Sequence, residues 1–200
     1  MLRRGAGMKI LFKNFCKLTE DESNMIWQAR NTPVVREKMY NQNEITWKEH
    51  CLWMVRLSGR IDCLYYLVYI NNKAVGVIDI TSIEQLTCEW GYYLFPEWQG
   101  SGFGILLEKI VIDFVFFTLN KELLFCSVIE ENENVYKNHM IIFGFIPDRR
   151  YTFTTDDGKK TRLFKGLSLG RNAWMQHKSQ ILERCLKVLK FESTRVEWLG

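Results

Sequence analysis

The sequence lacks the features that mark a membrane, secreted or zinc-binding protein. No segment reaches the roughly 20 consecutive apolar residues that a membrane-spanning helix needs, and the first residues hold no apolar run long enough for a secretory signal. The six cysteines include no C-x-x-C pair, which argues against zinc. We therefore expect a cytoplasmic protein with reduced thiols, no bound metal and no membrane partner.

An excess of charge of one sign is also missing. The chain has 27 Lys and Arg residues against 23 Asp and Glu residues, a formal net charge of +4, and the basic residues are spread along its length. A nucleic-acid-binding surface needs such residues gathered in a patch or stripe. We expect no nucleic-acid partner, whereas a small polyanionic ligand is compatible with this balance.

Prolines are scarce: the chain has three in 200 residues, which leaves long stretches for uninterrupted helices and strands. The composition is otherwise that of one soluble globular domain, with 47% hydrophobic and 25% charged residues. We place this domain at residues 8–169. It follows an N-terminal extension at 1–7, which we expect to be disordered, and precedes a C-terminal helical extension at 170–200.

Local patterns predict an α/β (α+β) fold. Thr19 and Thr46 each stand three residues before a glutamate, the spacing of a capping box that starts a helix. Runs of β-forming residues about a polar turn at 71–72 predict an antiparallel meander. We predict strands at 8–18, 64–83 (two strands), 86–95, 123–129 and 144–169 (a hairpin), and helices at 19–31, 46–57, 102–119, 132–143 and 171–191. The sheet is expected to be mixed, mostly antiparallel, of about seven strands, and flanked by helices.

The segment "YYLFPEWQGSGFG" (92–104) sets three glycines within five positions between a predicted strand and a predicted helix. Unpaired N–H groups and the helix dipole make such a turn a site for phosphate. Two common loops do not fit. Ile105 stands where a dinucleotide-binding fingerprint has its third glycine, and no lysine follows Gly104 as in a Walker loop. A glycine-rich turn without a ligand is the alternative.

The spacing of Gln99, Gly102 and Gly104 resembles the loop with which the GNAT superfamily of N-acetyltransferases binds the pyrophosphate of acetyl-CoA. This resemblance covers about residues 8–169. Within the superfamily, "ARNTPVVREKMY", "ITWKEHCLWM", "GVIDIT" and "CEWGYYLFPEWQGSGFG" resemble the N-acetyltransferases of pseudaminic acid biosynthesis. The resemblance implies a GNAT fold, acetyl-CoA as acetyl donor, and direct transfer in a ternary complex to the 4-amino group of a UDP-4-amino-4,6-dideoxy-N-acetyl sugar, for flagellin or surface-glycan modification.

The same resemblance implies where acetyl-CoA binds. An oxyanion donor is expected among the backbone N–H groups near Tyr93 to Phe95, and the pyrophosphate is expected at the glycine loop. The cofactor-binding residues on this basis are Tyr93, Leu94, Phe95, Gln99, Gly100, Ser101, Gly102, Phe103, Gly104 and Asn132.

Acetyl transfer to an amine also needs a base for the ammonium and a proton for the departing thiolate. Asn132, Val135 and His139 match the family pattern N-x-x-V-x-x-x-Tyr/His, so His139 is the predicted general acid and Tyr136 its reserve. A packed or solvated histidine is the alternative. Glu89 and Asp79 are the predicted base candidates, because acids on apolar central strands need a role or a structural hydrogen bond.

For the acceptor, the resemblance implies binding by Arg30, Met39, Tyr40, His50 and Tyr92. Arg30 suits a diphosphate because a guanidinium can donate two hydrogen bonds at once; a helix-end arginine bonded to carbonyls is the alternative. A polyamine or protein N-terminus as acceptor, and a non-catalytic binding module, are the competing functions. A polyamine groove should be lined by carboxylates, so Arg30 and His50 favour the nucleotide sugar. A homodimer is left open.

Overall fold

The structure is a computed structural model that describes residues 7–156, 160–177, 181, 187, 189 and 193–200. The predicted extension at 1–7 therefore lies outside the described residues except for Gly7, and so do residues 157–159 within the hairpin predicted at 144–169.

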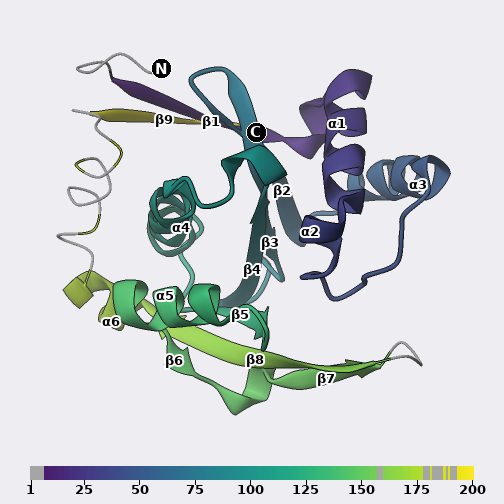
Figure 1. Cartoon of the computed structure of the whole chain (residues 1–200). Coiled ribbons are helices and arrows are strands. Elements are labelled where there is room, and N and C mark those ends of the chain that lie inside the picture. The colour runs from purple at the N-terminus through teal and green to yellow at the C-terminus, as the bar shows by residue number, and fades with distance from the viewer. Residues whose placement is uncertain (1–6, 157–159, 178–180, 182–186, 188, 190–192) are drawn as a thin grey trace.

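The elements follow the predicted α/β order (Figure 1). They are β1 (Met8–Asn14), α1 (Glu20–Asn31), α2 (Pro33–Arg36), α3 (Trp47–Leu57), β2 (Cys63–Ile70), β3 (Lys73–Thr81), β4 (Thr87–Leu94), α4 (Phe103–Asp113), β5 (Leu123–Ile129), α5 (Glu133–Phe143), β6 (Ile146–Pro147), β7 (Phe153–Asp156), β8 (Thr161–Gly170), α6 (Arg171–His177) and β9 (Thr194–Leu199). Both predicted capping boxes are present, with Thr19 and Glu22 at α1 and Thr46 and Glu49 at α3.

The strands of the described chain form one nine-stranded sheet in the order β6-β8-β5-β4-β3-β2-β1-β9, with β7 paired to β8. The predicted meander is confirmed, because β1 to β4 pair antiparallel in sequence. The β2–β3 turn uses Asn71 and Asn72, both at positive φ, as expected of asparagines in a tight hairpin. Two pairs are parallel, β4 with β5 and β1 with β9.

The last strand, β9, was not predicted. The sequence predicts a helical extension over 170–200. α6 agrees with this prediction at its start, most of residues 178–192 lie outside the described residues, and Thr194–Leu199 pairs parallel with β1. Trp198 stacks on Phe12 and on Phe114, with ring centroids 3.8 Å apart in each case. A helix prediction fails here because this short segment gains its strand partner and its aromatic contacts only through tertiary packing.

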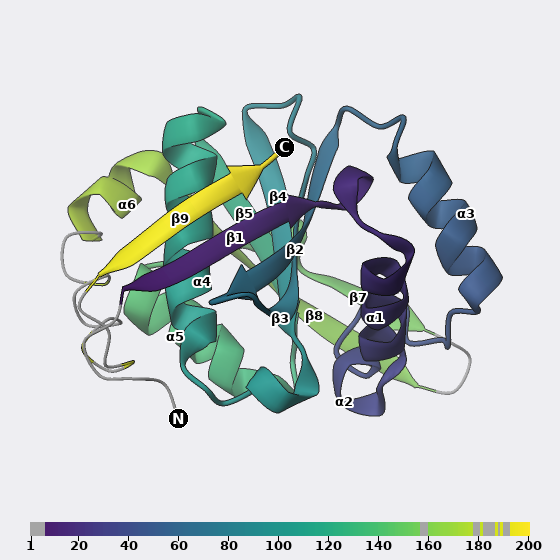
Figure 2. The same cartoon turned by 90° about the horizontal axis from the view of Figure 1, so that it is seen from above.

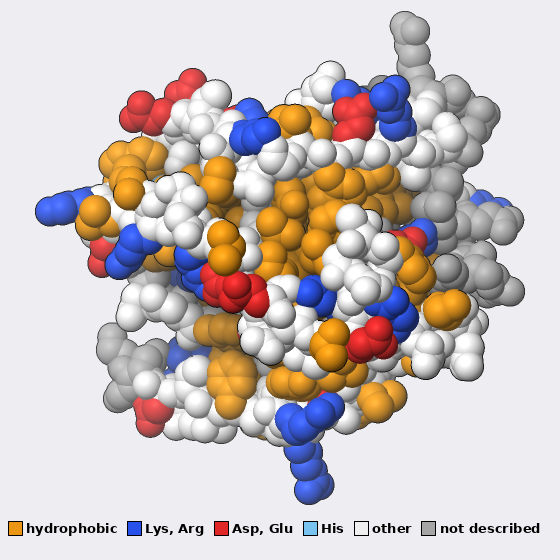
Figure 3. Space-filling model, turned by 180° about the vertical axis from the view of Figure 1, so that it is seen from behind, with side chains coloured by type: hydrophobic (Ala, Val, Ile, Leu, Met, Phe, Trp, Pro, Cys, Tyr) orange, Lys and Arg blue, Asp and Glu red, His pale blue; other side chains and the backbone are white. Residues whose placement is uncertain are grey.

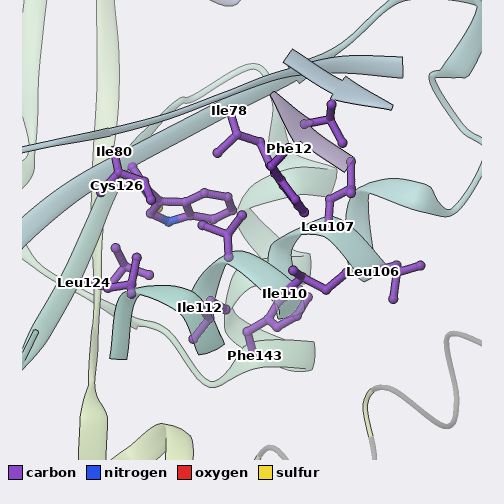
Figure 4. Packing of buried hydrophobic residues seen from close by; sticks show 14 of the residues in the cluster. Phe12, Ile78, Ile80, Leu106, Leu107, Ile110, Ile112, Leu124, Cys126 and Phe143 are labelled. Carbon is purple, nitrogen blue, oxygen red and sulfur yellow. The ribbon is translucent and has the colours of Figure 1, made fainter. Parts of the chain in front are cut away.

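Helices cover both faces of the sheet, α4 and α5 on one and α1, α2 and α3 on the other, as Figure 1 and Figure 2 show. The larger core lies under α4 (Figure 4), where Ile78 and Ile80 of β3 face Leu107 and Ile110. A smaller cluster that includes Phe95 packs beneath α1 and α3. Burial of these apolar faces fixes the helices on the sheet and so fixes the elements that form the site.

The face opposite the view of Figure 1 carries a central group of hydrophobic side chains with charged side chains around it (Figure 3). Groups of exposed apolar side chains are where other chains commonly pack. The homodimer stays a prediction. In the part of the chain that is described, no group of three His, Cys, Asp or Glu residues could hold a metal ion, and no helix is long and apolar enough to cross a membrane.

Candidate active site

The site begins where β4 and β5 separate. The two strands pair only from Thr87 to Glu89 on β4, after which β4 is paired with β3 and β5 with β8. The space between them is a cavity of about 830 Å³, a size that suits a small-molecule ligand. It crosses the sheet and so has two sides. We call the side toward α4 and α5 the cofactor side, and the side toward α1 and α2 the acceptor side.

Alternation along β4 assigns its side chains to these two sides. Tyr92 stacks on the core residue Trp90 and reaches Gly104, on the cofactor side. Tyr93 lies with Asp79 and Arg30, on the acceptor side. The resemblance assigns Tyr92 to the acceptor, whereas its side chain lies on the cofactor side. Tyr93 is expected to serve the cofactor through its backbone, and its side chain lies on the acceptor side. The family resemblance identifies positions along the sequence, whereas the side of the sheet to which each side chain points follows from the alternation of side chains along a strand.

The backbone of β4 has amides that do not pair with β3, close to where an oxyanion donor is expected. The Phe95 amide donates to the Val75 carbonyl at 2.9 Å and therefore points toward β3. Successive amides alternate in a strand, so those of Leu94 and Tyr92 point toward β5, and no strand of the described chain pairs with them on that side. Both residues line the cavity, whereas Phe95 is buried in the smaller core cluster. The open amides of β4 can thus meet a developing oxyanion.

The glycine loop forms a wall of the cofactor side. Gly100 and Gly102 have φ values of 72° and 85°, which favour glycine. Gly102, the N-cap of α4, has no side chain to accept from the first N–H groups of the helix, and the Phe103 amide donates only a long hydrogen bond of 3.4 Å to the Ser101 hydroxyl oxygen. A Cβ on Gly104 would lie 3.1 Å from the Tyr92 hydroxyl. Bare backbone at a helix N-terminus fits the pyrophosphate of acetyl-CoA.

Not every predicted residue of the loop reaches the cavity. Gln99, Gly100, Gly102 and Gly104 line it. Ser101 donates its hydroxyl hydrogen to the Trp98 carbonyl, and the Phe103 ring is buried against Trp98. These two side chains shape the loop and do not line its open surface.

His139 lies on the cofactor side and lines the cavity from α5. Its Nδ1 is hydrogen-bonded to Oε1 of Glu108 on α4, and the two side chains are 3% and 2% exposed. The edge of the Trp90 indole lies against the imidazole ring, with centroids 5.8 Å apart. Among the described residues, none forms a hydrogen bond with its Nε2. The histidine is buried, as the packing alternative expected, yet one nitrogen is left for the cavity.

Glu108 was missed by the sequence analysis. Burial raises the pKa of its carboxyl group, and the nearby His139 partly opposes that rise. A signal was present, because Glu108 has Val111 and Ile112 three and four residues further on, which places a carboxylate against the apolar face of a helix. The partner of such a carboxylate cannot be read from the sequence.

The other predicted residues at α5 fall into two groups, those that line the cavity and one that does not. Asn132, at the N-terminus of α5, lines the cavity together with Val135. Tyr136 does not line it; its ring lies under the Lys165 ammonium, 5.7 Å from Nζ. The predicted reserve acid is thus not brought to the site, because consecutive residues are about 100° apart around a helix, and Tyr136 leaves the face that Val135 presents to the cavity.

The two predicted base candidates meet on the acceptor side. Asp79 and Glu89 both line the cavity. Burial and the charge of Glu89 together raise the pKa of Asp79 from 3.8 to about 7. The position opposite Asp79 is Gly91, where a Cβ would come within 3.1 Å of Oδ1, so the missing side chain makes room for the carboxylate. A carboxyl group that titrates near neutrality can accept a proton at physiological pH.

Arg30 points into the acceptor side from the last turn of α1, with Met39 and Tyr40 beside it. Its Nη2 donates to the Asn41 carbonyl at 2.6 Å, as a helix-end arginine would. Its Nη1 is buried and, among the described residues, has no hydrogen-bond partner. A buried N–H without a partner is costly, and an anionic ligand would satisfy it.

His50 does not belong to the cavity, in contrast to the sequence analysis. Its Nε2 is 2.9 Å from the Ser23 hydroxyl, and its ring stacks on Trp47 with centroids 5.4 Å apart. Burial lowers the pKa of this imidazole. α3 is amphipathic and lays His50 against α1, so the side chain joins helix to helix away from the site.

Comparison with known proteins agrees with this geometry. Residues 14–138 match the acetyltransferase (GNAT) domain family. The chain belongs to the GNAT acetyltransferase family. It is therefore an acetyl-CoA-dependent N-acetyltransferase, with the mixed sheet and the cofactor expected from the glycine loop.

Relatives of this GNAT enzyme include acetyltransferase PseH of Campylobacter jejuni, 31% identical over 67% of this chain and 86% of the relative. The fold of the present chain is similar to that of C. jejuni PseH solved with acetyl coenzyme A, with a TM-score of 0.57, 24% identity, and coverage of 81% of this chain and 99% of that one. It is also similar to a Vibrio cholerae spermidine N-acetyltransferase solved with CoA and spermine, with a TM-score of 0.73, 15% identity, and coverage of 83% and 98%.

Proposed function

We propose that this GNAT enzyme acetylates the 4-amino group of a UDP-4-amino-4,6-dideoxy-N-acetyl sugar by direct transfer from acetyl-CoA in a ternary complex, a step of pseudaminic acid biosynthesis. The relatives named PseH support this choice of acceptor. The observation that carries it is the unpartnered Nη1 of Arg30 on the acceptor side. A diphosphate supplies the oxygens that this nitrogen lacks, and a planar guanidinium can bind two of them.

In this proposal the acceptor amine approaches from the acceptor side. Asp79, alone or through water, takes a proton from the ammonium, and Glu89 raises its basicity by repulsion. The neutral nitrogen then attacks the thioester carbon, and the oxyanion accepts hydrogen bonds from the open amides of β4. The new C–N bond stays as the C–S bond breaks, the nitrogen loses its second proton to water, and His139 gives a proton to the departing thiolate. Met39 and Tyr40 line the acceptor side of the cavity beside the sugar.

A polyamine acceptor is the second candidate, because a specific observation favours it. The acceptor side carries two carboxylates, Asp79 and Glu89, which could bind a cationic chain. His50, which had counted against a polyamine, lies outside the cavity. Arg30 opposes this candidate, since a cation would meet a buried, unpartnered guanidinium on the same side.

One experiment separates the acceptors. The purified full chain is mixed with acetyl-CoA and, in turn, the UDP-4-amino sugar, spermidine or a short peptide, and release of free thiol is followed. We expect a kcat/KM for the sugar at least about 10²-fold above the others, since a site built for a charged group discriminates strongly. Equal release with spermidine, or release with spermidine alone, would overturn the proposed acceptor. Acetyl-CoA alone gives the hydrolysis background.

A further inference from the structure

We propose that Glu108 is a positioning residue that holds one proton jointly with His139, so that His139 presents an N–H at Nε2 to the departing thiolate. This inference rests on the proposed role of His139 as general acid. It concerns the donor half of the reaction only, and it is independent of which amine is acetylated.

The surroundings of His139 fix its imidazole at Nδ1 and leave Nε2 without a hydrogen-bond partner among the described residues. The ring is fixed at Nδ1 by the hydrogen bond with Glu108, and by packing against Trp90 and Phe145. Because Nδ1 and Nε2 lie on different sides of the ring, a contact with α4 through Nδ1 turns Nε2 away from that helix. His139 lines the cavity, and no other described residue binds its Nε2. The partner at one nitrogen thus orients the other, the arrangement by which imidazoles are set for proton transfer.

The surroundings favour a dyad with no net charge. Both side chains are almost fully buried, and an isolated carboxylate at this depth would be strongly destabilised. A carboxylate next to an imidazolium and a carboxylic acid next to a neutral imidazole are the two forms of one shared proton, and each has zero net charge. In both forms Nε2 carries a hydrogen.

The other titratable groups near Glu108 do not compete for this proton. Tyr92 of β4 and Cys126 of β5 both face it, and burial raises the pKa of each, so they stay neutral around pH 7. Glu89 acts on Cys126 from β4. His139 is the partner on α5, and among the described residues no Lys or Arg forms an ion pair with Glu108. The pair is thus the local proton store on the cofactor side.

The proton balance closes with the established chemistry. As the C–S bond breaks, its electron pair goes to sulfur, and the Nε2–H proton forms the S–H bond of coenzyme A. The shared proton then rests on Nδ1, which leaves a neutral imidazole beside the Glu108 carboxylate. The attacking nitrogen, which still carries two hydrogens after it bonds to carbon, loses one of them to water as the amide forms. One proton from water restores the dyad, and Asp79 returns to water the proton that it took from the ammonium, so each turnover releases one proton in total. Glu108 keeps Nε2 in its donor form at the start of each turnover.

The first test needs no acceptor. The full chain is labelled with ¹⁵N-histidine; of its three histidines, His139 is assigned from the signals that His139→Phe removes. We expect Nε2 of His139 to resonate as a protonated nitrogen at pH 7 to 8. An unprotonated Nε2 under these conditions would overturn the proposal, whatever the acceptor.

The second test uses Glu108→Gln, which keeps the size and a hydrogen bond but cannot share the proton. With whichever acceptor the thiol assay identifies, we expect kcat to fall about 10- to 100-fold while the KM for acetyl-CoA stays within about 2-fold, the pattern of a lost transition-state interaction. Asp113→Asn is the matched control, since it removes a carboxylate of α4 that accepts from Trp174 outside the cavity. Wild-type kcat in Glu108→Gln would overturn the proposal, and failure of the UDP sugar alone would overturn only the proposed acceptor.

Discussion

The Tyr40 hydroxyl donates a hydrogen bond of 2.8 Å to Oε1 of Glu89, and so ties the segment after α2 to β4. Glu89 is also held where its charge acts on Asp79, and burial and that charge raise the pKa of Asp79 to about 7. One carboxylate is thus engaged by a phenol while the other stays available on the acceptor side. This division makes Asp79 the better base candidate and Glu89 the residue that tunes it.

The first prediction concerns the pH dependence of activity. Asp79 must be deprotonated to accept a proton, so kcat/KM should rise as the pH is raised toward about 7 and level off above it. Asp79→Asn should lower kcat by about 10²-fold or more and remove this rise. Glu89→Gln should shift the midpoint to lower pH, because it removes the repulsion. An unshifted midpoint in Glu89→Gln would assign the titration to another group.

The raised pKa of Asp79 should also make the stability of the folded protein depend on pH. In the unfolded chain Asp79 titrates near its ordinary 3.8, whereas in the folded protein it titrates near 7. Between these values the folded state binds more protons, so stability falls as the pH rises through this window. Asp79→Asn should therefore raise Tm more at pH 8 than at pH 4, measured by thermal unfolding. An equal change at both pH values would contradict the raised pKa.

Loss of the open glycine backbone should weaken cofactor binding. Gly102→Val should raise the KM for acetyl-CoA by about 10-fold or more, because it adds both a side chain and strain at a φ of 85°. Gly144→Ala is the control for strain alone, since Gly144 has a φ of 78° at the end of α5 and does not line the cavity. Equal KM values in the two variants would argue against the pyrophosphate site.

Substitutions of His139 and of Tyr136 should have different effects on kcat. His139→Phe should lower kcat by about 10²-fold with a smaller effect on either KM, as expected when a general acid is lost. Tyr136→Phe should keep kcat within about 2-fold, because Tyr136 lies outside the cavity. Steady-state thiol release measures both. Full activity in His139→Phe would move proton delivery to water.

Arg30 should decide between acceptors. Arg30→Ala should raise the KM for the UDP sugar by about 10- to 100-fold, because a charge-assisted pair with the diphosphate is lost. It should leave the KM for acetyl-CoA within about 2-fold. Arg36→Ala is the matched control: this arginine of α2 lies 3.8 Å from Glu44 and does not line the cavity. A lower KM for spermidine in Arg30→Ala, with no change for the sugar, would favour the polyamine acceptor.

The parts of the structure that could be predicted have local causes. A capping box requires two residues three apart, as at Thr19 and Glu22, and a left-handed position favours glycine, as at Gly102. Such signals depend on the chain within a few residues, so they predicted the starts of α1 and α3, the β4–α4 loop and the family. β9 lacked a local signal, because its strand partner, β1, is distant in the sequence.

The sequence by itself determined the order of strands and helices up to β8 and the position of the glycine loop, and its resemblance to the GNAT superfamily identified an acetyl-CoA-dependent N-acetyltransferase. Tertiary structure alone decided which side chains share the cavity. It joined Glu108 to His139, set Tyr92 and Tyr93 on opposite sides of β4, and buried His50 against α1. The physical reason is that these distances depend on how β4 and β5 separate and how α4 packs against α5, which no spacing along the chain encodes.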